Sequence, residues 1–163
     1  MTAAPSGEVT YVIASPFGTL AITANDRAIT RLTWARDGAT PSDPKTIDHP
    51  VLARAISQLQ EYFAGSRRDF DLPLEPPGGT FQKSVCDAML KIPFCETRTY
   101  GDLARDLGVA AQPIGQGCGG NPIPIIIPCH RVLAAGGKLG GFSGGQGVES
   151  KLALLRHEGA LLL

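Results

Sequence analysis

The chain has 163 residues, 43% of them hydrophobic and 18% charged, and its formal net charge at pH 7 is zero. This length allows one domain or two small ones, and the composition is that of an ordinary globular protein. No apolar run is long enough to span a bilayer, and the first residues lack the basic and apolar regions of a signal peptide, so we expect a cytoplasmic protein that does not bind membranes. Residues 1–78 carry 7 basic and 9 acidic side chains and residues 79–163 carry 8 and 6, too small a difference to predict a nucleic-acid partner from charge.

The first half of the chain predicts a small antiparallel sheet and one helix. Segments rich in β-branched and apolar residues, divided by turn residues, predict strands at 9–14, 18–24 and 28–35. One helix face, ending at Gly65, is predicted by apolar residues at steps of 4, 3 and 4: Leu52, Ile56, Leu59 and Phe63. Residues 69–74 have the composition of a further strand. No group of residues in this half is a candidate for a catalytic or binding site.

Turn and breaker residues gather at Leu72-Pro-Leu-Glu-Pro-Pro-Gly-Gly79 and predict a domain boundary. We expect an N-terminal supporting α/β domain over residues 1–75 and a mainly helical domain over residues 79–163. The fold class expected is therefore α+β, with a small antiparallel sheet preceding the helices.

The second half predicts several helices. Thr80 is a candidate cap for a helix with one apolar face, formed by Phe81, Val85, Ala88 and Ile92. Thr99 and Asp102 have the spacing of a capping box, which opens a short helix with Leu103 and Leu107 inward and Gly108 as its end. A second short helix is expected at 110–120. This succession is typical of a helix-turn-helix, although many helical hairpins bind nothing.

The second short helix contains no charged side chain and four glycines. Glycines lower helix stability but let another backbone approach closely. Two interpretations stay open, tight packing against a neighbouring helix and docking on the floor of a groove. In the second, Gln112 and Gln116 are the side chains that probe the groove.

Cys129 follows a run of three prolines and four isoleucines, Asn121-Pro-Ile-Pro-Ile-Ile-Ile-Pro-Cys-His-Arg-Val132. Prolines fix the backbone, and isoleucines are stiff residues of buried strands. A rigid segment that presents a thiol beside an imidazole is suited to a nucleophile. The alternative is a small buried hydrophobe beside a satisfied histidine.

The other three cysteines, Cys86, Cys95 and Cys118, are expected to be free packing residues. The four cysteines are spaced too irregularly for a zinc site, and we expect no metal. A reducing compartment would keep them as thiols.

The end of the chain adds two candidate features. Residues 136–147 contain seven glycines, which favours either a mobile wall beside a ligand or a plain flexible hairpin. In the last helix, Val148, Leu152 and Leu155 step by 4 and 3, and one more step of 3 reaches Glu158. An inward carboxylate needs a partner, for which His130 is the candidate, whereas the alternative is a solvated residue at a fraying helix end.

The second half resembles the active-site domain of O6-alkylguanine-DNA alkyltransferases. The resemblance runs from about Phe81 to Gly159, and its motifs are Ile92-Pro-Phe, Glu96-Thr-Arg-Thr-Tyr-Gly-Asp-Leu-Ala104, Asn121-Pro, Pro128-Cys-His-Arg-Val132, Gly141-Phe-Ser143 and His157-Glu-Gly159. The Pro-Cys-His-Arg-Val core with an upstream Asn-Pro is highly specific. The first half fits the family's variable amino-terminal domain in size and layout only.

The resemblance implies DNA repair by a protein that acts once, without a cofactor or an obligate protein partner. Its helix-turn-helix would dock in the minor groove of double-stranded DNA containing O6-alkylguanine, and the damaged base would be flipped into a pocket. Cys129 would take the alkyl group, and His130, oriented by Glu158, would draw the thiol proton through a water. Tyr100 would hydrogen-bond the base and help the leaving guanine accept a proton.

The same resemblance implies binding roles for further residues. Ser143 would meet guanine O6 beside Phe142, the backbone carbonyls of Cys129 and Val132 would read the exocyclic amine, and Asn121 would brace the turn before the cysteine. The residues expected at the DNA are Gln112, Gln116, Gly115 and Thr99, with Arg131 either structural or facing a phosphate.

Three departures from the family pattern stand out. Gln112 occupies the position of an arginine that enters the base stack, and Gly119-Gly120 replaces a second arginine. The aromatic residue before Ser143 is Phe142, where tyrosine is commoner. The departures in the helix predict weaker DNA binding.

Two other functions compete with this hypothesis. Alkyltransferase-like proteins bind O6-alkylguanine without transferring the group and act as damage sensors, but they replace the reactive cysteine, commonly by tryptophan. This chain keeps Cys129, His130, Tyr100 and Glu158, which favours alkyl transfer over lesion binding alone. A thiol hydrolase is a third hypothesis, although adjacent Cys and His are not the usual arrangement of a protease and no oxyanion-hole motif is evident.

Overall fold

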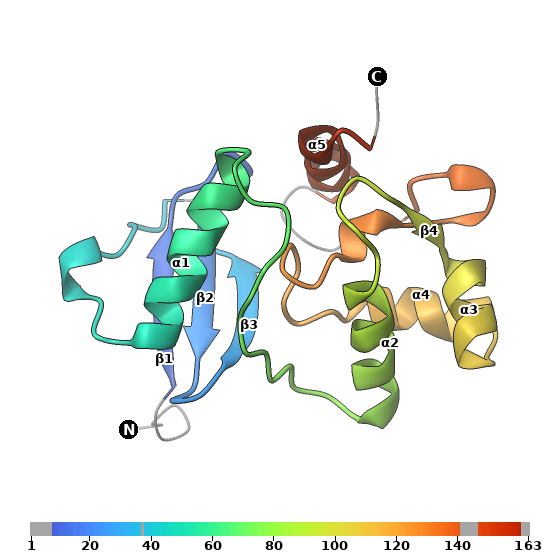
Figure 1. Cartoon of the computed structure of the whole chain (residues 1–163), viewed down its shortest axis with the longest axis horizontal. Helices are drawn as coiled ribbons and strands as arrows, with labels where there is room; N and C mark the ends of the chain where they lie inside the picture. Colours follow the sequence, from blue (N-terminus) through green and yellow to red (C-terminus); the bar gives the residue numbers. More distant parts are fainter. Residues whose placement is uncertain (1–7, 37, 141–146, 161–163) are drawn as a thin grey trace. The chain divides into compact units, whose positions relative to one another are not determined.

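The structure is a computed structural model that describes residues 8–36, 38–140 and 147–160 (Figure 1). The chain divides into two compact units, residues 1–77 and 78–163. In the described part of the chain, no helix has both the length and the apolar character needed to cross a membrane.

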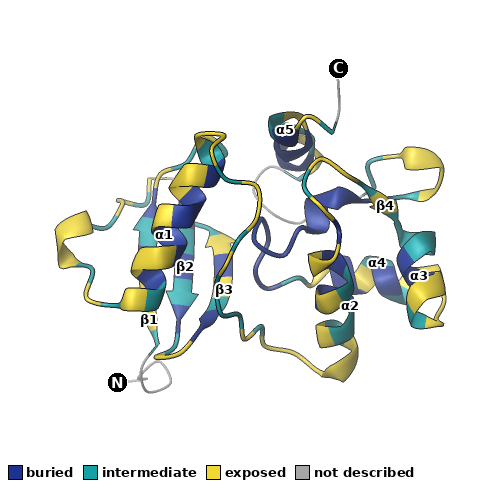
Figure 2. Ribbon diagram, viewed as in Figure 1, coloured by how far each residue is buried: buried dark blue, intermediate teal, exposed yellow. Residues whose placement is uncertain are grey.

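The first unit is a three-stranded antiparallel sheet packed against one helix. Strands β1 (Val9–Ile13), β2 (Leu20–Ala24) and β3 (Ile29–Trp34) pair in the order β1-β2-β3. Side chains of β2 alternate between buried and half-buried, as expected for a strand with one face in a core. Helix α1 (Pro50–Phe63) covers the sheet, and its buried positions are Leu52, Ala55, Ile56, Gln58, Leu59 and Tyr62 (Figure 2). The three strands and the helix confirm the sequence prediction.

Two details of the first unit correct the prediction. Residues 69–74 do not form a strand, and only Leu74 pairs with Ile29 of β3. The Ile29 N–H donates to the Pro73 carbonyl, and the Glu75 N–H donates to the Ile29 carbonyl. Pro73 has no N–H to donate, so the pairing cannot extend. In α1 the last apolar position that is fully buried is Tyr62, whereas Phe63 is half-buried.

The second unit is mainly helical and confirms the predicted α+β class. It contains α2 (Thr80–Leu90), α3 (Tyr100–Leu107), α4 (Ala111–Gly119) and α5 (Val148–Glu158). Two short strands, β4 (Arg98–Thr99) and β5 (Val132–Leu133), pair in parallel. Helices α3 and α4 pack together as the helix-turn-helix.

Helix α2 begins one residue earlier than the capping prediction assumed. Gly79 is the N-cap, and Thr80, which we expected to cap the helix, is its first helical residue. The buried face is Val85, Cys86 and Met89, while Phe81 is 40% exposed. Helix α4 meets this face closely, since a Cβ at Gly117 would lie 2.9 Å from a Val85 methyl group. The glycine therefore serves helix packing, which supports the first interpretation of the glycine-rich helix at this position.

Candidate active site

The segment before Cys129 is a buried turn and does not form the strand that its isoleucines suggested. Asn121 closes the turn at both ends, because its amide nitrogen donates to the Ile127 carbonyl at 2.8 Å and its amide oxygen accepts from the Ile123 N–H at 3.0 Å. Ile125 has φ +73, a backbone conformation that interrupts any extended run. The isoleucines are nonetheless buried, at 3% exposure or less, so the turn is anchored by its side chains.

Cys129 begins a short 3₁₀ helix, Cys129–Arg131, and is 6% exposed. Burial raises the pKa of its thiol to about 11, although Asn121 and Lys151 oppose this shift. At pH 7 a thiol with such a pKa is ionised in only about one molecule in 10⁴. A nucleophilic Cys129 therefore needs a base close by.

His130 and Glu158 form a fully buried pair. His130 Nε2 lies 2.7 Å from Glu158 Oε2, and both side chains have 0% exposure. Because a carboxylate only accepts, Nε2 carries the proton, and in the neutral ring Nδ1 is the free acceptor. Burial lowers the pKa of His130, even though Glu158 acts in the opposite direction. The imidazole is thus neutral at neutral pH and available as a base.

Nδ1 of His130 is a buried atom without a hydrogen-bond partner among the residues that the structure describes. Buried polar atoms in folded proteins are nearly always hydrogen-bonded. An unpaired acceptor beside Cys129 therefore indicates a functional group, suited to take a proton directly or through a water.

Glu158 also neutralises Arg131. The Nε and Nη2 of Arg131 donate to the two carboxylate oxygens at 2.8 and 3.0 Å, and its Nη1 donates to the Ile92 carbonyl at 2.6 Å. With a side chain only 7% exposed, Arg131 has little surface for a phosphate. Its geometry favours the structural role and speaks against the DNA-contacting role that the sequence left open.

Cys95 contributes to the same carboxylate through its backbone, a role that no pattern in the sequence indicates. Its N–H donates to Glu158 Oε1 at 3.3 Å, and its φ is +69, which L-residues other than glycine rarely adopt. We predicted a packing residue, but the Cys95 side chain is exposed.

This strained position predicts a stabilising substitution. Cys95→Gly is expected to raise the free energy of unfolding by about 0.5–1 kcal/mol, because it removes roughly 1–2 kcal/mol of left-handed strain against a smaller entropic cost in the unfolded chain. Urea denaturation measures the change. Cys95→Ala is the control, since it removes the thiol and keeps the strain. Equal stability of the two variants would show that the strain is absent.

Tyr100 lies at the start of α3 and faces several groups of the site. Burial raises the pKa of its hydroxyl, and the Cys118 and Cys129 thiols act in the same direction. A Cβ on Gly140 would lie 3.0 Å from this hydroxyl, so the backbone at Gly140 lies directly against it. The site therefore combines α3, the 3₁₀ helix at Cys129 and the backbone at Gly140.

The helix-turn-helix residues divide into exposed and structural positions. The side chains of Gln112 and Gln116 are exposed on α4. Gly115 faces inward, since a Cβ there would lie 3.9 Å from the Tyr100 ring. Thr99 closes the predicted capping box with Asp102, and its hydroxyl accepts from the Asp102 N–H at 3.1 Å.

Two expected site residues, Phe142 and Ser143, lie outside the residues that the structure describes. Val132 is buried in β5, and its carbonyl accepts a hydrogen bond from Lys151, a residue that the sequence analysis missed. A signal for Lys151 existed, because it lies four residues before Leu155 and seven before Glu158 on the same predicted helix, at steps that share a face.

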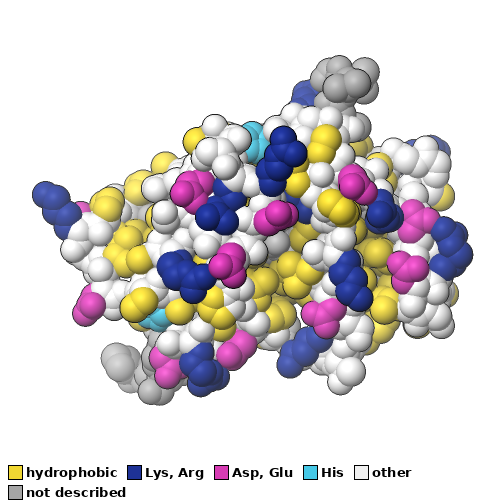
Figure 3. Space-filling view, in the orientation of Figure 1, with side chains coloured by type: hydrophobic (Ala, Val, Ile, Leu, Met, Phe, Trp, Pro, Cys, Tyr) yellow, Lys and Arg dark blue, Asp and Glu magenta, His cyan; other side chains and the backbone are white. Residues whose placement is uncertain are grey.

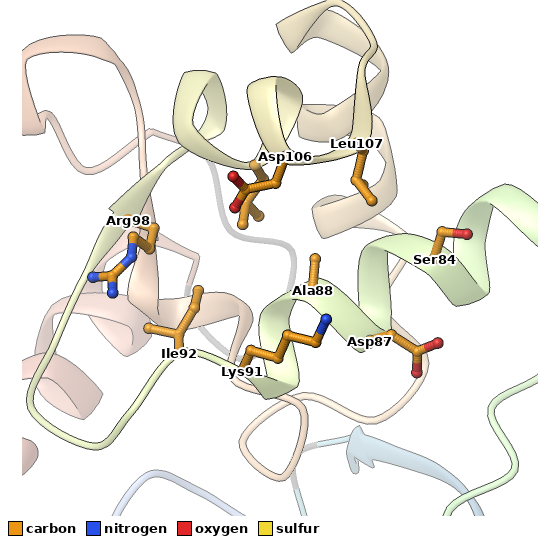
Figure 4. A pocket seen from close by; sticks show the side chains of 9 residues that line it. Ser84, Asp87, Ala88, Lys91, Ile92, Arg98, Asp106 and Leu107 are labelled. Carbon is orange, nitrogen blue, oxygen red and sulfur yellow. The ribbon is translucent and has the colours of Figure 1, made fainter.

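A pocket of about 390 Å³ lies elsewhere in this unit, between α2 and α3 (Figure 4). Its lining includes Asp87, Lys91, Arg98 and Asp106 around apolar side chains, and none of the expected site residues. Among the described residues, no group of three or more His, Cys, Asp or Glu side chains could hold a metal ion.

Both units are similar to parts of one known protein family. The ribonuclease-like domain of 6-O-methylguanine DNA methyltransferase matches residues 9–76, and the DNA binding domain of the same family matches residues 80–160. The chain belongs to the 6-O-methylguanine DNA methyltransferase family. The match covers both halves, whereas the motifs that suggested the family lie in the second half alone.

Individual members of the methyltransferase family are similar over almost the whole chain. The methylated-DNA–protein-cysteine methyltransferase of Mycobacterium tuberculosis is 42% identical over 149 residues, which cover 90% of this chain and 89% of that protein. The constitutive enzyme of the same name from Bacillus subtilis is 39% identical over 151 residues, covering 88% and 91%. The structure of M. tuberculosis OGT in complex with DNA has a TM-score of 0.78 and 41% identity, covering 91% of each chain.

Proposed function

We propose that this chain repairs DNA by transferring an alkyl group from guanine O6 in double-stranded DNA to Cys129. The sulfur–carbon bond forms as the carbon–oxygen bond breaks, so guanine is restored and a thioether remains on the protein. Each molecule acts once, because nothing in the reaction regenerates the thiol. The observation that carries the proposal is the buried Cys129 thiol next to a neutral His130 whose Nδ1 is unpaired among the described residues.

The proton of the reaction moves from the thiol to the guanine. His130 Nδ1 accepts the Cys129 proton, while Glu158 fixes the tautomer by accepting from Nε2. The Tyr100 hydroxyl hydrogen-bonds the base and assists protonation of the leaving guanine, since its raised pKa keeps it protonated. The Val132 carbonyl orients the base, Ser143 and Phe142 are the further residues expected to bind it, and Asn121 holds the turn before the nucleophile.

DNA docks on the helix-turn-helix through its minor groove. The exposed Gln112 and Gln116 of α4 face the groove, with Thr99 at the start of α3, while Gly115 packs behind them against the Tyr100 ring. The damaged guanine leaves the stack and enters the site, as base-directed enzymes require. The solved DNA complex of the M. tuberculosis protein supports DNA as the partner. No cofactor or protein partner is needed, and the expected compartment is the cytoplasm.

A titration tests the proposed stoichiometry. Increasing amounts of a duplex with one O6-methylguanine are incubated with a fixed amount of protein, and restored guanine is counted. The proposal expects a plateau at one guanine per protein molecule. Repeated turnover would contradict it, and lesion binding without restored guanine would identify the chain as an alkyltransferase-like damage sensor.

The recognition helix of this chain is atypical in carrying Gln112, where the family's pattern has an arginine. A glutamine can enter the stack and hydrogen-bond the orphaned base, but it supplies no charge against the phosphates. Basic and acidic side chains of the described residues are interspersed on the face drawn in Figure 3, in keeping with a net charge of zero. We infer that DNA affinity is modest and depends weakly on salt.

Gln112→Arg is expected to strengthen duplex binding several-fold and to steepen the dependence of log K on log salt by about one unit. Fluorescence anisotropy at several salt concentrations measures both quantities. Gln60→Arg is the matched control, because it adds the same charge at an exposed position of α1. If both variants bind equally, Gln112 does not lie at the DNA.

A further inference from the structure

Helix α2 has an apolar face that the fold covers only in part. The sequence predicted that Phe81, Val85, Ala88 and Ile92 form this face. Val85 is fully buried where Gly117 of α4 packs on it, whereas Phe81 is 40% exposed and Ala88 is half-buried. Among the described residues, α4 therefore covers one edge of the apolar face and leaves the other edge open.

The pocket of about 390 Å³ lies along this open edge, between α2 and α3 (Figure 4). Both helices pack against α4. The lining includes Ile92 and Leu103, which are 3% and 2% exposed, together with the half-buried Ala88 and Leu107. The volume is at the lower end of the range of about 300–1,000 Å³ that ligand sites occupy. The pocket is thus an apolar floor with room for a large apolar side chain.

Four exposed charged residues form the rim of this floor. Arg98 and Asp87 lie at opposite ends of the pocket, and Asp106 of α3 lies on the other side of it from Lys91 of α2 (Figure 4). Of these four side chains, Arg98 alone forms an ion pair among the described residues, with Glu96 at 3.5 Å. The rim therefore offers charges of both signs to a ligand.

This arrangement matches the anchor site of a protein interface. Such sites bury an apolar side chain at the centre and surround it with a polar rim. The carboxylates of Asp87 and Asp106 would repel the phosphates of a nucleic acid, which excludes a second DNA contact here. Opposite charges at the two ends fit an apolar residue that is flanked by an acidic residue on one side and a basic residue on the other.

We propose that the pocket between α2 and α3 binds a short peptide segment of a partner protein. The apolar side chain of the segment enters the pocket, its acidic residue faces Arg98 and its basic residue faces Asp87. No lining residue belongs to α4, so Gln112 and Gln116 stay accessible to DNA while the peptide is bound. Alkyl transfer does not need this partner, and the proposal does not rest on alkyl transfer.

Selection from a displayed library of random peptides, with the full chain immobilised, tests the proposal. Enriched sequences are expected to share a large apolar residue with an acidic residue on one side and a basic residue on the other. A synthetic peptide of the enriched sequence is then titrated by calorimetry. Asp87→Lys is expected to weaken its binding at least about fivefold, and the loss should shrink as salt rises.

Exchange of charges between peptide and protein locates the site. A peptide whose basic residue is replaced by an acidic one should bind Asp87→Lys more tightly than it binds the wild type. The reciprocal result is expected for Arg98→Glu and a peptide whose acidic residue is replaced by a basic one. Lys83→Glu is the matched control and should leave the affinity unchanged, because Lys83 is exposed on α2 outside the pocket lining.

Three results would overturn the proposal. The first is a selection that enriches no sequence, and the second is a peptide that binds Asp87→Lys and Arg98→Glu as tightly as the wild type. The third is a dimer in analytical ultracentrifugation that Asp87→Lys dissociates, because the pocket would then belong to a second copy of this chain. Both substituted side chains are exposed, so each variant is expected to fold.

Discussion

Replacing Glu158 by alanine is expected to lower the free energy of unfolding by about 3–5 kcal/mol, because the buried Arg131 guanidinium would lose its counter-charge. The carboxylate accepts two hydrogen bonds from Arg131, one from His130 and one from the Cys95 N–H. Guanidinium denaturation measures the loss.

Two further variants separate this effect from a general weakening of α5. Glu149→Ala removes an exposed carboxylate from the first turn of the same helix and is expected to cost well under about 1 kcal/mol. In the double variant Glu158→Ala with Arg131→Met, part of the stability should return, because no uncompensated charge remains. A loss below about 1 kcal/mol in Glu158→Ala would contradict the buried network.

Replacing His130 by glutamine is expected to slow alkyl transfer by about 10²–10⁴-fold at neutral pH, because the general base is lost. In the wild type, transfer should fall only as pH drops through the lowered pKa of His130, below its ordinary value of 6.5. In His130→Gln, the rate should instead follow the thiolate fraction and rise about tenfold per pH unit toward the Cys129 pKa of about 11.

Single-turnover rates over a range of pH measure this change. His157→Gln is the matched control, since His157 is the half-buried histidine next to Glu158 on α5 and the proposal gives it no role. A His130→Gln protein with the wild-type pH profile would show that the thiol ionises without this base. Circular dichroism confirms that each variant is folded.

The features that the sequence predicted well are those set by short-range patterns. The capping box of Thr99 and Asp102 needs only two side chains and the backbone between them, and it forms as expected. Helical periodicity correctly placed Leu155 and Glu158 on the buried face of α5, and Glu158 meets His130 there. The same pattern was wrong for Val148, which is 43% exposed, and for Leu152, which is half-buried. The three strands of the first unit are likewise bounded by local turn residues.

The features that sequence reasoning missed depend on contacts between distant segments. The left-handed conformation of Cys95 is held by a carboxylate 63 residues later, and no local pattern encodes it. The isoleucines before Cys129 have strand propensity, but Asn121 and the intervening prolines close them into a turn. Lys151 was overlooked because lysine is ordinarily exposed, and its burial depends on the Val132 carbonyl and the nearby thiols.

The most direct test of alkyl transfer to Cys129 is peptide mass spectrometry after mixing the protein with a duplex that contains one O6-methylguanine. The proposal predicts that the peptide containing Cys129 becomes heavier by one methylene and that Cys129→Ala shows no such change. Cys95 serves as an internal control, because its exposed thiol would report non-specific alkylation. An unmodified Cys129 in a protein that still binds the lesion would contradict transfer.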